Sequence, residues 1–273
     1  MRHGAYPGGR DMNRRSRVLG FVLAPLIGVG AGTLSTAQQT DPDFQGMWSD
    51  PPTSPALSFC FVGCVQEAFA YFNSVLEDPE YFDQSYAELQ QRATEYQTEF
   101  IRSRLTSAGV EIFPFDFVAN DPSLRCQAWG LALQMLAPHQ VQITQYDDRV
   151  EFYYAEWAAR RTVYLSPRER PSGTDSSRLG YSVGHYESNE LVVETTSIEP
   201  DILYAGADES SFTHSDRLFV VERYTKTTDG SRLELVATLE DPVTLTEPLT
   251  IWKSWAWAPD EVIYDYECTV PAD

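Results

Sequence analysis

Short runs of alternating apolar and polar residues fill the chain from residue 141 onward. This period of two is typical of β-strands that bury one face. The runs predict strands at Val141–Tyr146, Val150–Glu156, Arg161–Leu165, Gly180–Glu187, Glu190–Ser197, Asp216–Thr225, Arg232–Glu240, Leu249–Trp257 and Val262–Cys268. Asp229-Gly230, between two of these runs, is the strongest hairpin signal in the chain.

Most of the links between these runs are short turns, such as Asp147-Asp148, Ser188-Asn189 and Pro259-Asp260. Parallel strands need longer crossover connections, so the runs predict an antiparallel meander. This many strands with one buried face close into a barrel or bend strongly. We therefore expect a mainly β fold, built as a calycin-like or lipocalin-like barrel or as a strongly bent sheet.

A helical period precedes the strands. Apolar residues three and four apart predict one helix from Cys64 to Leu76, ended by Asp78-Pro79. They predict a second helix from about Gln84 to Ser107, with Gly109 as its C-terminal cap. We expect this N-terminal helical pair to cover one end or one face of the sheet.

The first 37 residues have the pattern of an export signal. Arg14, Arg15 and Arg17 form a basic region, Val18–Leu34 is an apolar run, and Ser35-Thr36-Ala37 is a small-residue cleavage site. The signal fits a start at Met12 better than one at Met1. Arg14-Arg15 also hints at the twin-arginine route. We expect a periplasmic or secreted protein.

The domain organisation follows from these patterns. Residues 1–37 are the expected signal peptide, residues 38–124 the arm and helical pair, and residues 125–273 the β domain. Within the second segment, the proline-rich residues 41–59 predict an irregular arm that Phe44 and Trp48 anchor to the body.

Charge excludes some partners. The chain has 20 Lys and Arg against 40 Asp and Glu, a formal net charge of −20. Such a surface repels nucleic acid and anionic lipid. The apolar run of the signal is short and broken by Pro25, so stable membrane insertion is not expected. The oligomeric state is left open.

The four cysteines are Cys60, Cys64, Cys126 and Cys268. An even number in an exported chain predicts two disulfides, with three connectivities open. We favour Cys60–Cys64 and Cys126–Cys268, the second tying the last strand to the start of the β region. Four thiolates around zinc are disfavoured, because the spacings do not pair up and export favours oxidation.

Gly180–Gly184 reads G-x-S-x-G, the pattern of a hydrolase nucleophile elbow. An elbow needs a strand before the serine and a helix after it. Here the turn at Ser188-Asn189 and the strand that follows predict a β-hairpin instead. The direction of the face that carries Tyr181, Val183 and His185 is left open.

His214, with Asp216 two residues on, could act as a base with its orienting carboxylate, and His185 is a second candidate. The alternative is a solvated His214 at the start of a strand. A metal site would require both histidines to converge with Glu187 or Asp216, which the sequence does not determine. We assign no metal and no cofactor.

Several charges lie on apolar strand faces, where an unpaired charge is costly. Glu156, Arg161 and Glu222 are in phase with buried neighbours, and Arg223 is in the opposite phase. Either they form internal pairs, Glu156–Arg161 or Glu222 with an arginine, or they line a cavity walled by aromatic residues. In the second case the expected ligand-binding residues are Tyr181, Glu156, Arg161, Glu222, Arg223 and Tyr154.

The chain resembles an uncharacterised family of exported, β-rich bacterial proteins. The likeness covers roughly residues 125–268 and rests on Arg125-Cys126, Gln145, Arg161-Thr-Val-Tyr164, Ser182-Val-Gly184, His214-Ser215, Glu222-Arg223-Tyr224, Asp241-Pro242 and Glu267-Cys268. Family members often carry a histidine where this chain has Tyr181. The resemblance implies export, a β-rich fold and interest in His214, and it implies no reaction.

The expected function is to bind a small apolar or aromatic molecule inside the barrel. Acid–base chemistry of the isomerase, cyclase or lyase type, with His214 as base, would extend that role. The alternatives are a secreted hydrolase or metal-dependent enzyme, and a non-catalytic interaction module of the envelope.

Overall fold

A computed structural model describes residues 41–49, 59–60, 63–111, 121–166, 175–205, 211–265 and 267–269. These residues belong to one compact unit that begins at Thr40. The expected signal peptide lies outside the described residues.

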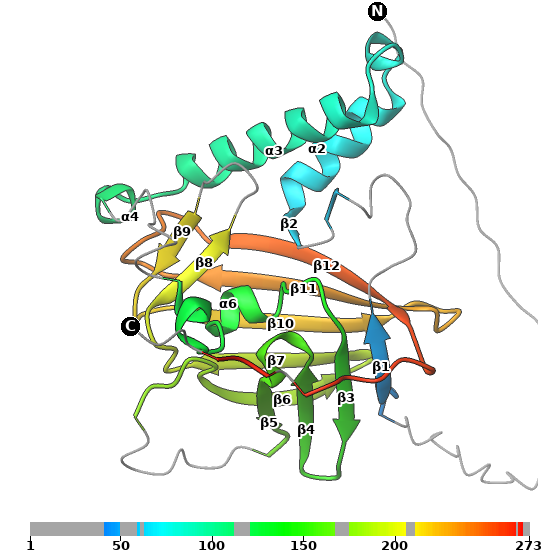
Figure 1. Ribbon diagram of the computed structural model, residues 1–273, viewed down its shortest axis with the longest axis vertical. Coiled ribbons are helices and arrows are strands. Elements are labelled where there is room, and N and C mark those ends of the chain that lie inside the picture. The colour runs from blue at the N-terminus through cyan, green and yellow to red at the C-terminus, as the bar shows by residue number, and fades with distance from the viewer. Residues whose placement is uncertain are drawn as a thin grey trace, which may run out of the picture. The chain divides into compact units, whose positions relative to one another are not determined.

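Nine strands close into a barrel (Figure 1). Their order is β1-β3-β4-β5-β6-β7-β10-β11-β12, and β12 pairs back with β1. The bounds are β1 Gly46–Ser49, β3 Val141–Gln145, β4 Arg149–Tyr154, β5 Arg160–Tyr164, β6 Tyr181–Glu187, β7 Glu190–Thr196, β10 Phe219–Lys226, β11 Arg232–Glu240 and β12 Leu249–Trp257. This confirms the mainly β barrel. Strands such as β4, β10 and β11 bury alternate residues on the inner face, as in the iBiBiBiBe burial pattern of β11.

One pair of neighbouring strands breaks the antiparallel order. β5 and β6 run parallel and are paired only at Val163↔Ser182 and Tyr164↔Val183. The segment between them, residues 165–180, is long enough to return the chain in the same direction. The expected antiparallel meander therefore fails at this one pair of strands. Because the pairing is so short, the N-terminal half of β5 separates from the chain that leads into β6.

The N-terminal arm supplies the closing strand. In β1, Trp48 pairs with Val141 of β3 on one side and with Trp257 of β12 on the other. Phe44 and Trp48 are both fully buried, as expected of anchors. Gly46 has φ +135°, and a Cβ there would lie 2.2 Å from the ring of Trp257. Residues Gly46–Ser49 of the arm are thus part of the barrel wall, whereas an irregular segment was expected.

The prediction of a last strand at Val262–Cys268 is wrong. Residues 261–265 and 267–269 form no strand, and Val262 and Tyr264 are 62% and 83% exposed. The physical reason is that β1 has already paired with β12, so that edge of the sheet is occupied. Both expected disulfides, Cys60–Cys64 and Cys126–Cys268, are present.

A second, two-stranded sheet was not predicted. It consists of β8, Asp201–Ala205, and β9, Ser211–His214, which pair antiparallel. The hairpin contacts the short helices α4, Ser107–Glu111, and α6, Leu131–Gln134. His214 therefore ends a strand, where it was expected to open one.

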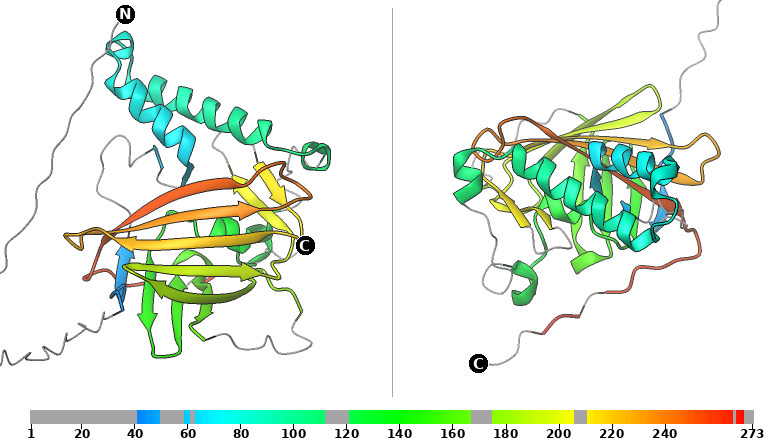
Figure 2. Two further views of the ribbon diagram at one scale, coloured as in Figure 1. Left: turned by 180° about the vertical axis from the view of Figure 1, so that it is seen from behind. Right: turned by 90° about the horizontal axis from the view of Figure 1, so that it is seen from above.

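The two long helices, α2 Gln66–Glu77 and α3 Tyr86–Ser103, pack against each other (Figure 2). α3 begins with a capping box, in which Ser85 and Glu88 satisfy each other's backbone amides. α2 adjoins β12 and the two-residue strand β2, Cys64–Val65. The ring of Phe69 stacks on Trp252 at 4.7 Å, which fixes the pair to the barrel wall.

The second helix ends earlier than the sequence predicted. Arg104 is its C-cap, and Gly109 lies inside α4. Thr106 Oγ1 accepts a hydrogen bond from the Gly109 amide, so the chain starts a new helical turn. The remaining short elements are the 3₁₀ turns η1 Pro79–Tyr81, η2 Pro122–Arg125 and η3 Glu156–Ala158. Within the described ranges, the helices are too short or too polar to span a bilayer.

Candidate functional site

A buried ion pair joins two strands across the barrel interior. Arg161 of β5 and Glu222 of β10 have side chains that are 2% and 0% exposed. Arg161 Nη1 donates to Glu222 Oε1 at 2.9 Å, and Nη2 donates to Oε2 at 2.5 Å. Two parallel hydrogen bonds between charged groups are the strongest form of this contact. Of the two alternatives for Arg161, the pair with Glu222 is the one that forms.

Neighbouring hydroxyl groups complete the network around this pair. Arg161 Nε donates to Ser182 Oγ at 2.9 Å, and Nη2 donates to Thr195 Oγ1 at 2.7 Å. The Tyr224 hydroxyl donates to Glu222 Oε1 at 2.7 Å, and Ser182 and Thr195 share a hydrogen bond of 3.0 Å. A buried pair whose polar atoms are satisfied in this way holds its geometry firmly.

Arg161 and the two buried phenols of Tyr154 and Tyr224 keep their protons near neutral pH. Burial lowers the pKa of Arg161, but the charge and hydrogen bonds of Glu222 outweigh this and raise the pKa above its ordinary value. Burial and the charge of Glu222 raise the pKa of Tyr224, and burial raises that of Tyr154. Arg161 therefore stays charged, and both phenols stay protonated.

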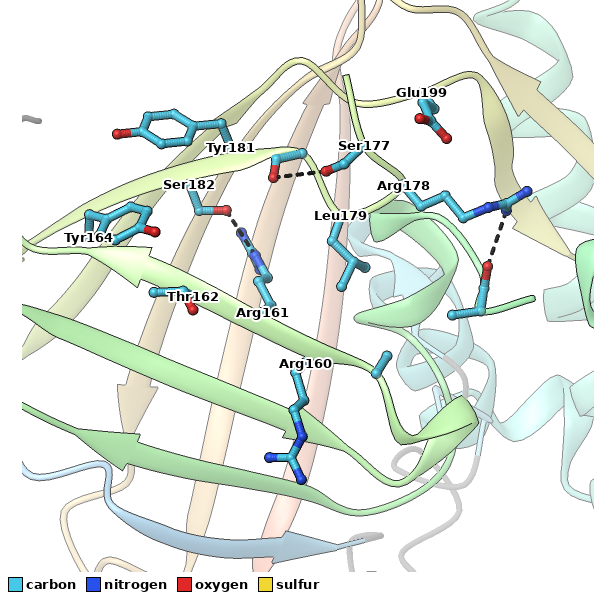
Figure 3. Close-up of a pocket in the computed structure, with 13 residues that line it drawn as sticks. Arg160, Arg161, Thr162, Tyr164, Ser177, Arg178, Leu179, Tyr181, Ser182 and Glu199 are labelled. Atoms are coloured by element: carbon cyan, nitrogen blue, oxygen red, sulfur yellow. Dashed lines mark hydrogen bonds between the residues drawn. The ribbon is translucent and has the colours of Figure 1, made fainter. Parts of the chain in front are cut away.

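A cavity of about 590 Å³ lies where β5 and β6 separate (Figure 3). Arg161 and Ser182 contribute to its wall, so the buried network reaches the cavity. Tyr164 and Tyr181 stand beside it with ring centroids 5.6 Å apart and planes 30° apart. The other lining residues are Ala128, Ala159, Arg160, Thr162, Ser177, Arg178, Leu179, Gly180 and Glu199.

The two other arginines of the cavity are engaged elsewhere. Arg178 Nη1 donates to Asp201 Oδ2 at 2.5 Å and to the Ala128 carbonyl at 3.1 Å. The guanidinium of Arg160 lies 3.8 Å from the ring centroid of Tyr153. Figure 3 shows both side chains extending away from Ser182. The end of the cavity beside Ser182 is therefore aromatic and polar but has little net charge.

Glu156 was a candidate ligand-binding residue and lies elsewhere. β4 ends at Tyr154, so Glu156 falls in η3, out of phase with the strand. Its carboxylate pairs with His139, so the expected alternative of a Glu156–Arg161 pair is wrong. Tyr154 itself is buried in the interior, and its hydroxyl forms no hydrogen bond of normal geometry among the described residues.

Arg223 lies outside the barrel. The burial pattern of β10, iBiBeBii, places Glu222 and Tyr224 inside and Arg223 on the solvent face. There it donates to Glu187 at 3.1 Å and to Glu190 at 2.8 Å. Ion pairs this exposed contribute little to stability.

The structure decides the direction of β6. Ser182 and Gly184 are buried, whereas His185 is exposed and Tyr181 and Val183 are half-buried. The inner face is thus the serine face, and His185 points to solvent. The predicted hairpin is present, with its turn at Ser188-Asn189.

The environment of Ser182 differs from that of a hydrolase nucleophile. A strand follows Gly184, where an elbow requires a helix. The hydroxyl group contacts Arg161 and Thr195, not a histidine. Among the described residues, no three His, Cys, Asp or Glu side chains gather closely enough to hold a metal ion.

His214 is buried, and Asp216 does not orient it. The residue is 2% exposed, and Nδ1 of its ring lies 2.9 Å from the Ser215 carbonyl. A carbonyl can only accept, so Nδ1 carries the hydrogen, which leaves Nε2 as a buried acceptor with no hydrogen-bond partner in the described structure. Asp216 is exposed, and it is Asp241 that accepts from the Ser215 amide, at 2.6 Å. Burial lowers the pKa of His214.

Sequence reasoning missed most of the cavity wall. Ser182 and Thr195 occupy buried phases of β6 and β7, and a small polar residue in such a phase was the available signal. Leu179 and Ser177 precede β6 in a segment that carries no strand pattern. Their place in the wall depends on the parallel pairing of β5 and β6.

Comparisons with protein-family models and with curated protein sequences found no match.

Proposed function

We propose that this barrel binds a small, uncharged aromatic or apolar molecule in the cavity between β5 and β6. The observation that carries the proposal is the cavity itself. Its volume of about 590 Å³ lies within the range of roughly 300–1,000 Å³ that is common for small-molecule sites. It combines apolar and aromatic walls with a few fixed polar groups.

The charge distribution favours an uncharged ligand. Glu222 neutralises Arg161, and Asp201 neutralises Arg178. A charged ligand would lose its hydration without gaining a free counterion beside Ser182. A flat ring can pack on Tyr164 or Tyr181, since both rings lie against the cavity.

The residues support binding more strongly than catalysis. His214, the expected base, does not line the cavity. Arg161 and Tyr224 hold their protons near neutral pH, because the pKa of each is raised. Among the described residues, neither His214 nor the Arg161 network therefore supplies a base for acid–base chemistry or hydrolysis at this site.

We also propose that the protein acts outside the cytoplasm. Two disulfides and the export pattern of residues 1–37 support this location, because disulfides persist in oxidising compartments. The resemblance to exported bacterial proteins agrees with it.

Native mass spectrometry on protein purified from the periplasm tests the proposal. We expect a mass increment from a co-purifying small molecule, and its loss in Leu179→Trp, where the larger side chain fills the cavity. Leu124→Trp is the matched control, because Leu124 is 54% exposed and does not line the cavity. An increment that persists in a folded Leu179→Trp protein would place the ligand elsewhere.

A further inference from the structure

We infer that the backbone edge of β5 at Arg160–Thr162 binds the ligand, which therefore carries an N–H and a C=O on either side of one carbon, as in an N-acylglycine amide. The ligand N–H donates to the Arg160 carbonyl, and the ligand C=O accepts from the Thr162 amide. This inference rests on the proposed function and names the ligand class for the same cavity.

Alternate residues of β5 direct their backbone groups away from β4. The Tyr154 amide donates to the Ala159 carbonyl at 2.9 Å, in the same register as the β4–β5 ladder, so the odd-numbered residues of β5 bond with β4. In an antiparallel pair each residue turns both backbone groups to one side, and consecutive residues alternate. The N–H and C=O groups of Arg160 and Thr162 therefore point toward the β6 side.

The parallel ladder between β5 and β6 stops at Gly180. It contains two residue pairs, and both lie beyond Thr162 in β5. One further rung would join the Gly180 amide to the Arg160 carbonyl, and the Thr162 amide to the Gly180 carbonyl. The Gly180 amide donates instead to the Ser177 carbonyl at 3.1 Å, and its carbonyl accepts from the Ser177 hydroxyl at 3.3 Å. The next rung of the ladder is therefore missing.

The conformation of Gly180 explains why the ladder does not continue. Gly180 has φ +69°, in the left-handed region that glycine adopts without strain and that an extended strand does not use. A Cβ there would lie 2.7 Å from Thr195 Cγ2 and 2.8 Å from Ile198 Cγ1, so the surrounding side chains hold the backbone in this turn. β5 thus keeps an open edge.

This open edge belongs to the cavity wall. Arg160 and Thr162 both line the cavity, and the first is exposed and the second half-buried. Figure 3 shows them on one side of the cavity and Ser177 on the other. Among the described residues, β5 pairs with β4 and β6 alone. Such an edge is a template for a further piece of extended backbone.

The missing rung defines the chemistry of the ligand. In the ladder, Gly180 would present an N–H and a C=O on either side of its Cα, and a molecule that fills this place needs the same two groups. Both partners on β5 are uncharged backbone groups, so a neutral ligand gains two hydrogen bonds without the cost of desolvating a charge.

The order of the two groups also orients the ligand. A carbonyl can only accept and an amide N–H can only donate, so the ligand C=O lies beside Thr162, on the side of Tyr164. Tyr164 and Tyr181 both line the cavity and are half-buried. A ring attached beyond the ligand C=O can therefore pack on these tyrosines. N-acetylglycine benzylamide is a simple molecule with this arrangement.

Three neutral compounds test the inference. N-acetylglycine benzylamide has both groups. In its acetoxy analogue an ester oxygen replaces the glycine N–H, and in N-phenylbutylacetamide methylene groups replace the glycine C=O and the second N–H. Isothermal titration to the purified protein measures each affinity. We expect N-acetylglycine benzylamide to bind about 5-fold or more tightly than either analogue, the effect of one net hydrogen bond.

Thr162→Pro removes the proposed donor. Because the Thr162 N–H points away from β4, proline there costs no hydrogen bond of the β4–β5 ladder. The variant should bind N-acetylglycine benzylamide about 5-fold more weakly and N-phenylbutylacetamide as before. Thr162→Val is the matched control, since it keeps the N–H and a similar shape, and it should retain the original affinities.

Hydrogen exchange of the Thr162 amide, followed by NMR in the unmodified protein, provides a second measurement in case Thr162→Pro does not fold. N-acetylglycine benzylamide should slow this exchange, and N-phenylbutylacetamide should not. Unchanged exchange of the Thr162 amide at saturation with N-acetylglycine benzylamide would overturn the inference.

The remaining outcomes separate this inference from the proposed function. Equal binding of the three compounds, or a folded Thr162→Pro protein with the full preference, overturns the role of the β5 edge. Cavity binding then still stands if Leu179→Trp blocks all three compounds. If none of the three binds, the inference is overturned, and the mass increment of a co-purifying molecule decides the proposed function separately.

Discussion

Arg161 and Glu222 form a doubly hydrogen-bonded ion pair across the barrel, with N–O distances of 2.9 and 2.5 Å. They come from β5 and β10, which are not neighbours in the sheet. The pair therefore fixes the distance between two walls of the barrel. It also supplies the polar end of the cavity, because Arg161 holds Ser182 in place.

Glu222→Gln should destabilise the fold strongly. The substitution leaves the charge of Arg161 buried without a counterion, which typically costs about 3–5 kcal/mol. The free energy of unfolding, from urea denaturation at pH 7, measures the effect. Glu187→Gln is the control, because it removes an exposed partner of Arg223 and should change the free energy by less than about 1 kcal/mol. Similar values for the two variants would contradict the role assigned to the pair.

His214 should make the stability depend on pH in a defined window. Burial lowers its pKa below the ordinary 6.5, offset in part by the Ser215 carbonyl and the charges of Asp201 and Asp241. The unfolded chain therefore binds the proton more readily than the folded chain. The stability that the buried, uncharged His214 contributes is fully present above pH 6.5. It is lost as the pH falls below 6.5 toward the lowered pKa.

His214→Phe tests this window. The free energy of unfolding is measured at intervals from pH 7.5 to pH 5 for the original and variant proteins. We expect a smaller loss of stability over this range in the variant. His185→Gln removes an exposed histidine and should retain the original slope. An unchanged slope in His214→Phe would show that the buried ring does not set the dependence.

The two disulfides should contribute unequally. Cys126 and Cys268 are 142 residues apart, and Cys60 and Cys64 only 4. Loop-closure entropy predicts about 5 kcal/mol for the long loop and about 2 kcal/mol for the short one. Thermal unfolding of Cys126→Ser/Cys268→Ser and of Cys60→Ser/Cys64→Ser compares them. A larger loss of stability in Cys60→Ser/Cys64→Ser would mean that the entropy of the unfolded chain does not dominate the stabilisation by these disulfides.

Gly46→Ala should weaken the closure of the barrel. The residue has φ +135°, and a Cβ would lie 2.2 Å from the ring of Trp257, so the ring must move. We expect a loss of about 2–3 kcal/mol together with a change in tryptophan fluorescence. Gly230→Ala is the matched control. Its φ is +71° but nothing lies within 4 Å, so only the backbone cost of about 1 kcal/mol remains.

The sequence by itself determined the local features of this protein. The hairpin of β10 and β11 could be predicted from the sequence. The alternation of apolar and polar residues and the Asp229-Gly230 turn both act within one short stretch of the chain. The inward phase of Arg161 and Glu222 followed from the same alternation. The helical pair and both disulfide pairs were also predicted, the first from its periodicity and the second from the export context and the positions of the cysteines.

Only the tertiary structure decided the features that depend on distant segments. The parallel pairing of β5 with β6, the closure by β1, and the choice of Glu222 over Glu156 each join parts of the chain that no local pattern relates. Closure left no free edge for Val262–Cys268, and the short parallel pairing opened the cavity beside Ser182. The site lies where local strand patterns end and long-range packing sets the geometry.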